Sequence, residues 1–233
     1  MNKFSLLKAA VGAAVLLGCH DSTQPDSDAK PNFAASSGDL ECASHVTGGT
    51  YNNVLVPVDA ECWLYDAVVR GNVTLSQYAR LVMHNDEVRG SIEGDNATFF
   101  NLNASRVFGN IRATGYSRRP DEIFPGIVQI TDTDLPNGDV IVEQTNTLDI
   151  NIIGNTVRKG SIVMRQNYVA ANFDFLVRDN KVGGNLQVLD NTGEHQKFVH
   201  TNIVRGTLEC SGNQEPFTGG PNIARRLEGS QCF

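Results

Sequence analysis

The sequence has few of the features that signal catalysis or a membrane span. It has no His-Glu-x-x-His pair and no Gly-x-Ser-x-Gly turn, which excludes two familiar hydrolase signatures. Its one free-standing apolar run, residues 9–18, is about half as long as a helix that crosses a bilayer. The net charge of −7 argues against a nucleic-acid partner.

What the sequence does have is a five-residue pattern, Gly-polar-aliphatic-x-apolar. The third residue is always Val, Ile or Leu, so the third and fifth residues form the buried face of a short strand. An eighth copy opens the series with Asn52 in place of glycine, which predicts positive φ at this position, since Gly and then Asn tolerate it best. The other seven copies begin at Gly71, Gly90, Gly109, Gly138, Gly160, Gly184 and Gly206.

A second apolar segment follows most copies, for example at residues 79–83 and 98–102. Recurring short strands without helical periodicity predict an all-β fold, a right-handed parallel β-helix of about eight coils over residues 39–233. The small polar second residues are expected to form a hydrogen-bonded ladder along the axis. An antiparallel sandwich is the alternative, but a sandwich has no reason to repeat one side chain at one place.

The spacing of the copies reveals an insertion. The interval from Gly109 to Gly138 is 29 residues, whereas the three preceding intervals are 19. The extra residues fall at 116–125, and insertions in solenoids become external loops. The sequence therefore predicts a candidate ligand loop for a glycan or an anionic partner, with a plain excursion between strands as the alternative; its residues are Tyr116, Arg118, Arg119 and Phe124.

The first 18 residues have the pattern of a signal peptide, with Lys3 and Lys8 before the apolar run. The segment that ends at Cys19 resembles the bacterial lipobox, which implies a lipid anchor on this cysteine. Residues 19–38 are rich in Pro, Asp and Ser and are expected to be a flexible tether. We therefore expect a protein of the cell envelope, held at the outer membrane or cell surface by its lipid.

Four cysteines remain, two at each end of the repeats: Cys42, Cys62, Cys210 and Cys232. Four cysteines allow three pairings. We expect the two local ones, because the ends of such a solenoid lie too far apart to be bridged. Each disulfide would close a terminal coil and would require an oxidising compartment.

The search for reactive groups gives weak candidates. Glu93 and Arg112 occupy the same outward position on successive coils, which fits a lyase acid/base pair less well than a solvated ion pair. The segment from Asp132 to Asp139 matches a calcium loop poorly. Trp63 is interpreted as packing over the first coil rather than as a sugar platform. The sequence thus predicts no catalytic residue, no metal site and no cofactor.

The opening residues 49–57, Cys62-Trp63-Leu64 and 69–73, with the closing residues 208–213 and 229–232, resemble a group of exported bacterial right-handed β-helix proteins with little assigned function. Pectate-lyase-like enzymes share only the architecture. The coil length is similar to that of bactofilins, which polymerise, but the cysteine-closed ends depart from their pattern.

The resemblance and the leader together imply a non-catalytic, surface-anchored lipoprotein, acting as a monomer in envelope structure or in binding a polysaccharide or an envelope protein. The alternatives are a small polysaccharide lyase or hydrolase, and a self-associating structural protein.

Overall fold

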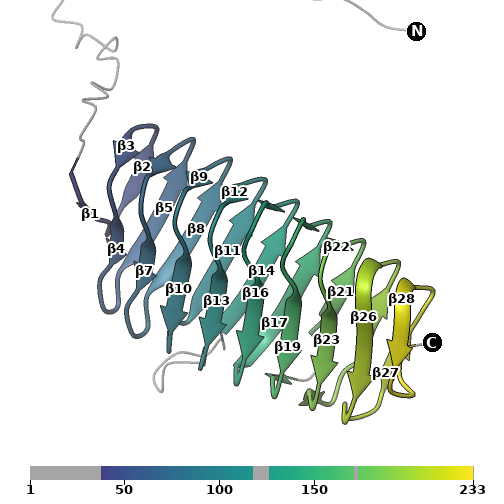
Figure 1. The fold of residues 1–233 in the computed structure, drawn as a ribbon. Helices are drawn as coiled ribbons and strands as arrows, with labels where there is room; N and C mark the ends of the chain where they lie inside the picture. Colours follow the sequence, from purple (N-terminus) through teal and green to yellow (C-terminus); the bar gives the residue numbers. More distant parts are fainter. Residues whose placement is uncertain (1–37, 118–125, 171–172, 233) are drawn as a thin grey trace, which may run out of the picture. The chain divides into compact units, whose positions relative to one another are not determined.

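The computed structural model describes residues 38–117, 126–170 and 173–232, which all belong to one compact unit. They form a parallel β-solenoid of about eight turns (Figure 1), as predicted, and contain no α-helix. Within these ranges, accordingly, no helix is long and apolar enough to cross a membrane.

Each coil contributes strands to three rows, and all recorded strand pairs are parallel. Two rows belong to the first sheet, which faces the viewer in Figure 1, and the third row is the second sheet, which lies behind them. The main row of the first sheet comprises β1 (Leu40–Glu41), β4 (Val54–Val56), β7 (Val73–Leu75), β10 (Ile92–Asp95), β13 (Ile111–Thr114), β16 (Val140–Glu143), β19 (Ile162–Arg165), β23 (Leu186–Leu189), β26 (Ile203–Ser211) and β28 (Ile223–Glu228).

The short row of the first sheet comprises β3 (Thr50–Tyr51), β6 (Val68–Val69), β9 (Glu87–Val88), β12 (Arg106–Val107), β15 (Asp134–Leu135), β18 (Thr156–Val157) and β22 (Lys181–Val182), and continues into the first residues of β26 and β28. The second sheet comprises β2 (His45–Thr47), β5 (Glu61–Tyr65), β8 (Arg80–His84), β11 (Phe99–Asn103), β14 (Gly126–Thr131), β17 (Asn146–Ile153), β21 (Phe175–Arg178), β25 (Lys197–His200) and β27 (Phe217–Gly219), with β20 (Tyr168–Val169) and β24 (Thr192–Gly193) paired beside β17.

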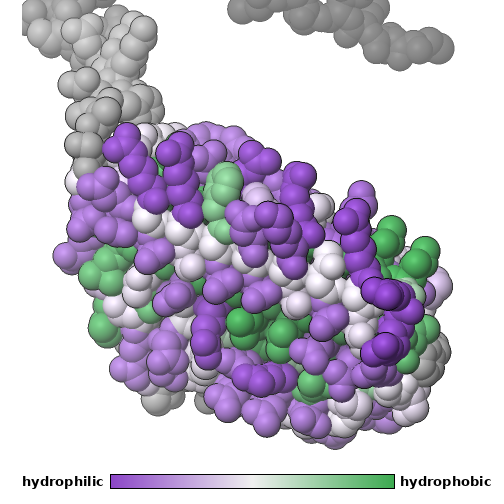
Figure 2. All heavy atoms as spheres, in the orientation of Figure 1, coloured by the Kyte–Doolittle hydropathy of each residue, from purple (hydrophilic) through white to green (hydrophobic). Residues whose placement is uncertain are grey.

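The core is a column of apolar side chains inside the coils. The third and fifth repeat positions point inward, as predicted; Val73, Ile92 and Ile111, which pair in register, are at most 1% exposed. The second sheet contributes alternate residues such as Leu81 and Met83. On the face shown in Figure 2, hydrophilic side chains dominate and hydrophobic ones form small groups rather than one patch.

The repeat glycines are required for a different reason from the one expected. Neither the seven glycines nor Asn52 has positive φ, so that prediction is wrong. A Cβ on Gly109 would lie 2.6 Å from the carbonyl oxygen of Gly90, and one on Gly206 would lie 2.5 Å from that of Gly184. Real Cβ atoms do not approach backbone that closely, so glycine is needed where successive coils meet. Positive φ instead occurs at corner residues such as Asp66 and Asn85.

The predicted polar ladder is present along the second repeat position. The Oδ1 of Asn53 accepts from the backbone N–H of Asn72 at 3.0 Å, and the Oδ1 of Asn72 accepts from Ser91 at 2.8 Å. The same contact continues on the following coils as far as Thr207.

Two buried asparagine ladders at the corners were not predicted from the sequence. In one of them, Asn180 donates from Nδ2 to the carbonyl of Ile152 at 2.8 Å and to Oδ1 of Asn202 at 3.0 Å. These side chains satisfy backbone groups that the corners would leave unpaired inside the protein. The first ladder contains Asn155, Asn180, Asn202 and Asn222, and the second contains Asn167, Asn191 and Asn213.

Both predicted disulfides are confirmed. Cys42 is bonded to Cys62 and Cys210 to Cys232, each with a Cα–Cα distance of 5.3 Å. They lie near the two ends of the solenoid, so each links a terminal coil to its neighbour.

Candidate ligand-binding site

The outer face of the second sheet carries exposed aromatic side chains at its N-terminal end. The rings of His45 and Trp63 stack with centroids 4.8 Å apart and planes 10° apart. Trp63 also lies 6.4 Å from Tyr65, which lies 6.4 Å from His84. We call these four residues the aromatic cluster; all are half-buried or exposed.

The alternation of the strands produces this cluster. In β5, Cys62 and Leu64 point into the core, so Trp63 and Tyr65 point out. Parallel register then places His45 beside Trp63 and Tyr65 beside His84. Trp63 does contact the first coil, as expected, but it does so on the outer surface, where its ring remains accessible.

Polar side chains continue the same face toward the C-terminus. His84 Nδ1 lies 2.9 Å from Asn103 Oδ1, and Asn103 Nδ2 donates to Thr131 at 2.6 Å. In the neighbouring column, Asn101 donates to Gln129 at 3.2 Å. Further along, Gln129 and Asn151 both donate to Oδ2 of Asp149, at 2.9 and 2.7 Å. We call this set the amide ladder; it comprises Asn101, Asn103, Gln129, Thr131, Asp149 and Asn151.

Asp149 is the one acid of the amide ladder and is half-buried. Burial raises the pKa of its carboxyl group; the hydrogen bond from Gln129 opposes this and the nearby charge of Asp174 adds to it. Asp174 is adjacent because its carbonyl accepts from the N–H of Ile150, the residue after Asp149. Among the described residues, Oδ1 of Asp149 and Oδ1 of Asn151 are buried and have no hydrogen-bond partner. Both atoms are therefore unsatisfied acceptors beneath the surface, whereas the other oxygen of Asp149 accepts from Gln129 and Asn151.

The candidate ligand loop is corrected at Tyr116. Its side chain is 1% exposed and packs edge-on against Phe100 at 6.4 Å, so it belongs to the core and cannot contact a ligand outside. The chain is still in the coil at this point, because the carbonyl of Tyr116 accepts from the N–H of Asn146 at 2.6 Å. The other loop residues, Arg118, Arg119 and Phe124, and the lipidation candidate Cys19 lie outside the described residues.

Glu93 and Arg112 are register partners on adjacent coils, as expected. However, the guanidinium of Arg112 donates to Glu143, on the coil beyond, at 2.6 Å. Glu143 also accepts from Arg165 at 2.6 Å and is only 4% exposed. This arrangement links three coils through ion pairs, and Arg112 is paired with Glu143 rather than with Glu93.

The segment that resembled a calcium loop is also occupied by ion pairs. Asp134 accepts from Arg106 and Arg158, whose hydrogen bonds hold the pKa of its carboxyl group below the usual value. In the part of the chain that the structure describes, no group of three or more His, Cys, Asp or Glu side chains could hold a metal ion.

Comparison with protein-family models, curated proteins and solved structures gives no match for this chain. The amide ladder was not predicted from the sequence, although the sequence contains a signal for it. The triplets Asn101-Leu102-Asn103, Gln129-Ile130-Thr131 and Asp149-Ile150-Asn151 place polar residues on both sides of a buried one in three successive coils.

Proposed function

We propose that the protein binds a glycan without cleaving it, along the outer face of the second sheet. The observation that carries this proposal is the stacked pair His45–Trp63, continued by a hydrogen-bonded amide ladder on the same face. Aromatic faces pack against the C–H faces of sugar rings, while amides both donate to and accept from sugar hydroxyls.

The size of the face favours an oligosaccharide over a single sugar. From β2 to β17 there are five steps between adjacent strands, each about 4.8 Å, which gives a length of about 24 Å. The half-buried side chains of Asp149 and Asn151 lie at one end of this length and the aromatic cluster lies at the other. A chain of several sugars could contact both ends at once.

The place of action belongs to the same proposal. A lipid on Cys19 and a tether over residues 19–38 would hold the solenoid, as a monomer, at the outer membrane or cell surface. The leader sequence supports this location, and the two disulfides are compatible with an oxidising compartment.

The test is a glycan array followed by titration calorimetry on the best ligand. Trp63→Ala should weaken binding at least about tenfold, since loss of an aromatic stacking partner costs about 1.4 kcal/mol or more. The matched control is Phe108→Ala, a half-buried aromatic residue in the turn after β12. Equal losses in both variants, or no glycan bound by the wild type, would refute the proposal.

A hydrolase remains the second candidate because of one observation. Burial raises the pKa of Asp149, which lies one coil from Asp174, and a carboxyl group with a raised pKa beside a second acid is typical of the general acid of glycosidases. The same polymers should be assayed for reducing-end and unsaturated products. Cleavage that Asp149→Asn abolishes while binding persists would replace the binding proposal with the enzymatic one.

A further inference from the structure

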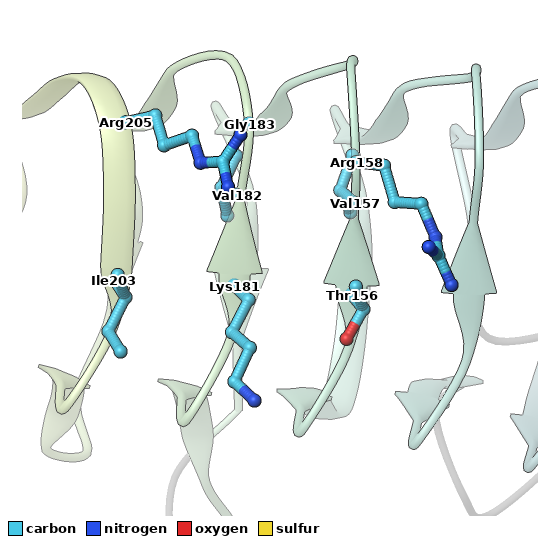
Figure 3. A pocket seen from close by; sticks show the side chains of 8 residues that line it. All are labelled: Thr156, Val157, Arg158, Lys181, Val182, Gly183, Ile203 and Arg205. Carbon is cyan, nitrogen blue, oxygen red and sulfur yellow. The ribbon is translucent and has the colours of Figure 1, made fainter.

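A hollow of about 390 Å³ lies on the short row, a different surface from the proposed glycan site. It occupies three successive coils, β18, β22 and β26 (Figure 3). Because Val157, Val182 and Val204 are register partners, the residues that follow them take equivalent positions. These are Arg158, Gly183 and Arg205, so a glycine stands between two arginines.

The glycine creates the hollow and cannot be replaced easily. A Cβ on Gly183 would collide with the carbonyl oxygen of Arg158 on the preceding coil. The close approach of the two coils therefore keeps this position free of a side chain, and a gap remains between the flanking arginines.

The cations around the gap differ in whether their side chains have a hydrogen-bonding or ion-pair partner. Arg158 extends away from the hollow (Figure 3) and donates to Asp134 at 2.8 and 3.1 Å. Arg205 extends over Val182 and Gly183, whereas Lys181, on the same coil as the glycine, points away from Arg205 at the other side of the hollow. Among the residues that the structure describes, neither Lys181 nor Arg205 has a hydrogen bond or ion pair with another side chain, and none of those that line the hollow is a carboxylate.

Lys181 and Arg205 are thus two cations without a side-chain partner beside this gap, on a chain whose net charge is −7. Unpaired positive charge attracts anions, and the planar guanidinium of arginine matches the oxygens of phosphate and sulfate. The hydroxyl of Thr156 adds a donor, while Ile203, which is 45% exposed, offers an apolar surface to the carbon skeleton that carries the anion.

We propose that this hollow binds an oxyanion, a phosphate or sulfate group esterified to a larger molecule, through Arg205 and Lys181. The site is separate from the proposed glycan face and does not depend on it. Its ligand would be charged, whereas the aromatic cluster and amide ladder suit neutral sugar rings.

The test is a titration followed by ¹H–¹⁵N NMR of the purified protein at low salt, with inorganic phosphate, glucose 6-phosphate, glucose 6-sulfate and unmodified glucose as probes. We expect the amide signal of Gly183 and the Nε signal of Arg205 to shift saturably with the anionic probes, with Kd of about 1 to 10 mM. Salt at 0.15 M should weaken the binding, because it screens exposed charges.

Lys181→Gln and Arg205→Gln should each weaken binding at least about fivefold, which corresponds to about 1 kcal/mol. The control is Arg70→Gln, which removes the same charge at the equivalent place near the N-terminal end of the short row. Thermal unfolding verifies that the variants fold. The proposal is overturned if no saturable shift occurs below about 50 mM, if glucose shifts Gly183 as strongly as glucose 6-phosphate, or if Arg70→Gln weakens binding as much as Arg205→Gln.

Discussion

The hydroxyl group of Tyr116 occupies the space that a side chain at residue 94 would fill, and residue 94 is glycine. The other repeats carry an apolar residue at this fifth position, such as Leu75 or Ala113. Gly94 departs from the repeat because the ring of Tyr116, on the next coil, needs the space that an apolar side chain would take.

Gly94→Ala should lower the free energy of unfolding by about 1 to 3 kcal/mol, because overpacking displaces the ring of Tyr116. Tyr116→Leu in the Gly94→Ala background should recover part of this loss, although Tyr116→Leu alone is destabilising through the space it leaves. Chemical denaturation of the four proteins gives the coupling. Strictly additive effects would contradict the contact.

Asp86 is expected to make stability depend on pH. It takes a position in the corner ladder that asparagine fills in later coils, and its Oδ1 accepts from the N–H of Ala67 at 2.7 Å. Its Oδ2 is buried without a partner among the described residues, and burial raises the pKa to about 6. Because the folded pKa exceeds the unfolded value of 3.8, this group stabilises the fold below about pH 4, and that contribution is lost as the pH rises through about 6.

Asp86→Asn should remove this dependence and raise the free energy of unfolding at pH 7.5 by up to about 3 kcal/mol, the equivalent of about two pKa units. Urea denaturation between about pH 4 and pH 8 measures it. Asp190→Asn, at an exposed corner, is the control, and an equal change of its stability profile would contradict the assignment to the buried Asp86. A variant whose stability still falls between pH 4 and pH 6 would assign the effect to another group.

The buried ladders should matter more to stability than the exposed one. Asn180 accepts from the N–H and the side chain of Asn155 and donates to Ile152 and Asn202, so Asn180→Ala leaves several buried groups unpaired. We expect a loss of about 2 to 4 kcal/mol. Asn72→Ala should cost below about 1 kcal/mol, since water can replace its exposed contact with Ser91.

Denaturation curves compare the two variants, and hydrogen exchange locates the effect. The amide of Asn155 should lose protection in Asn180→Ala. Equal losses of stability in both variants would show that burial does not determine how much each ladder contributes to the free energy of unfolding.

Removal of one disulfide should destabilise one end only. Replacing both Cys42 and Cys62 by Ser should lower the free energy of unfolding by about 3 kcal/mol on the chain-entropy model for a loop of 20 residues. Exchange should rise in the first coils and stay unchanged near Cys210. Loss of protection throughout would mean that the solenoid unfolds as a single unit.

The sequence was sufficient to predict the solenoid, its buried face and its disulfides, because each follows from a residue type recurring at one place. The reason for the repeat glycines was predicted wrongly. Glycine is favoured both by a positive φ and by a close approach of two backbones, and only the position of the neighbouring coil shows which of the two applies. Tyr116 was placed in an external loop because an aromatic residue beside a long interval looks exposed, and the space left by Gly94 is visible only in three dimensions.

The candidate site was harder to predict than the fold. Its residues alternate with core residues, and the insertion changes their spacing, so Asn101, Gln129 and Asn151 recur at unequal intervals of 28 and 22 residues. The hollow at Gly183 depends on register across three coils. In both cases the chemistry comes from neighbours on adjacent coils, which a linear pattern does not reveal.

The two disulfides lie at the ends, and every coil between them is joined to its neighbours by the same kinds of contact. A whole coil could therefore be gained or lost between Cys62 and Cys210 during evolution without disturbing either bridge. The number of coils, and with it the length of the proposed binding face, is the property of this protein that we expect natural variation to change most readily.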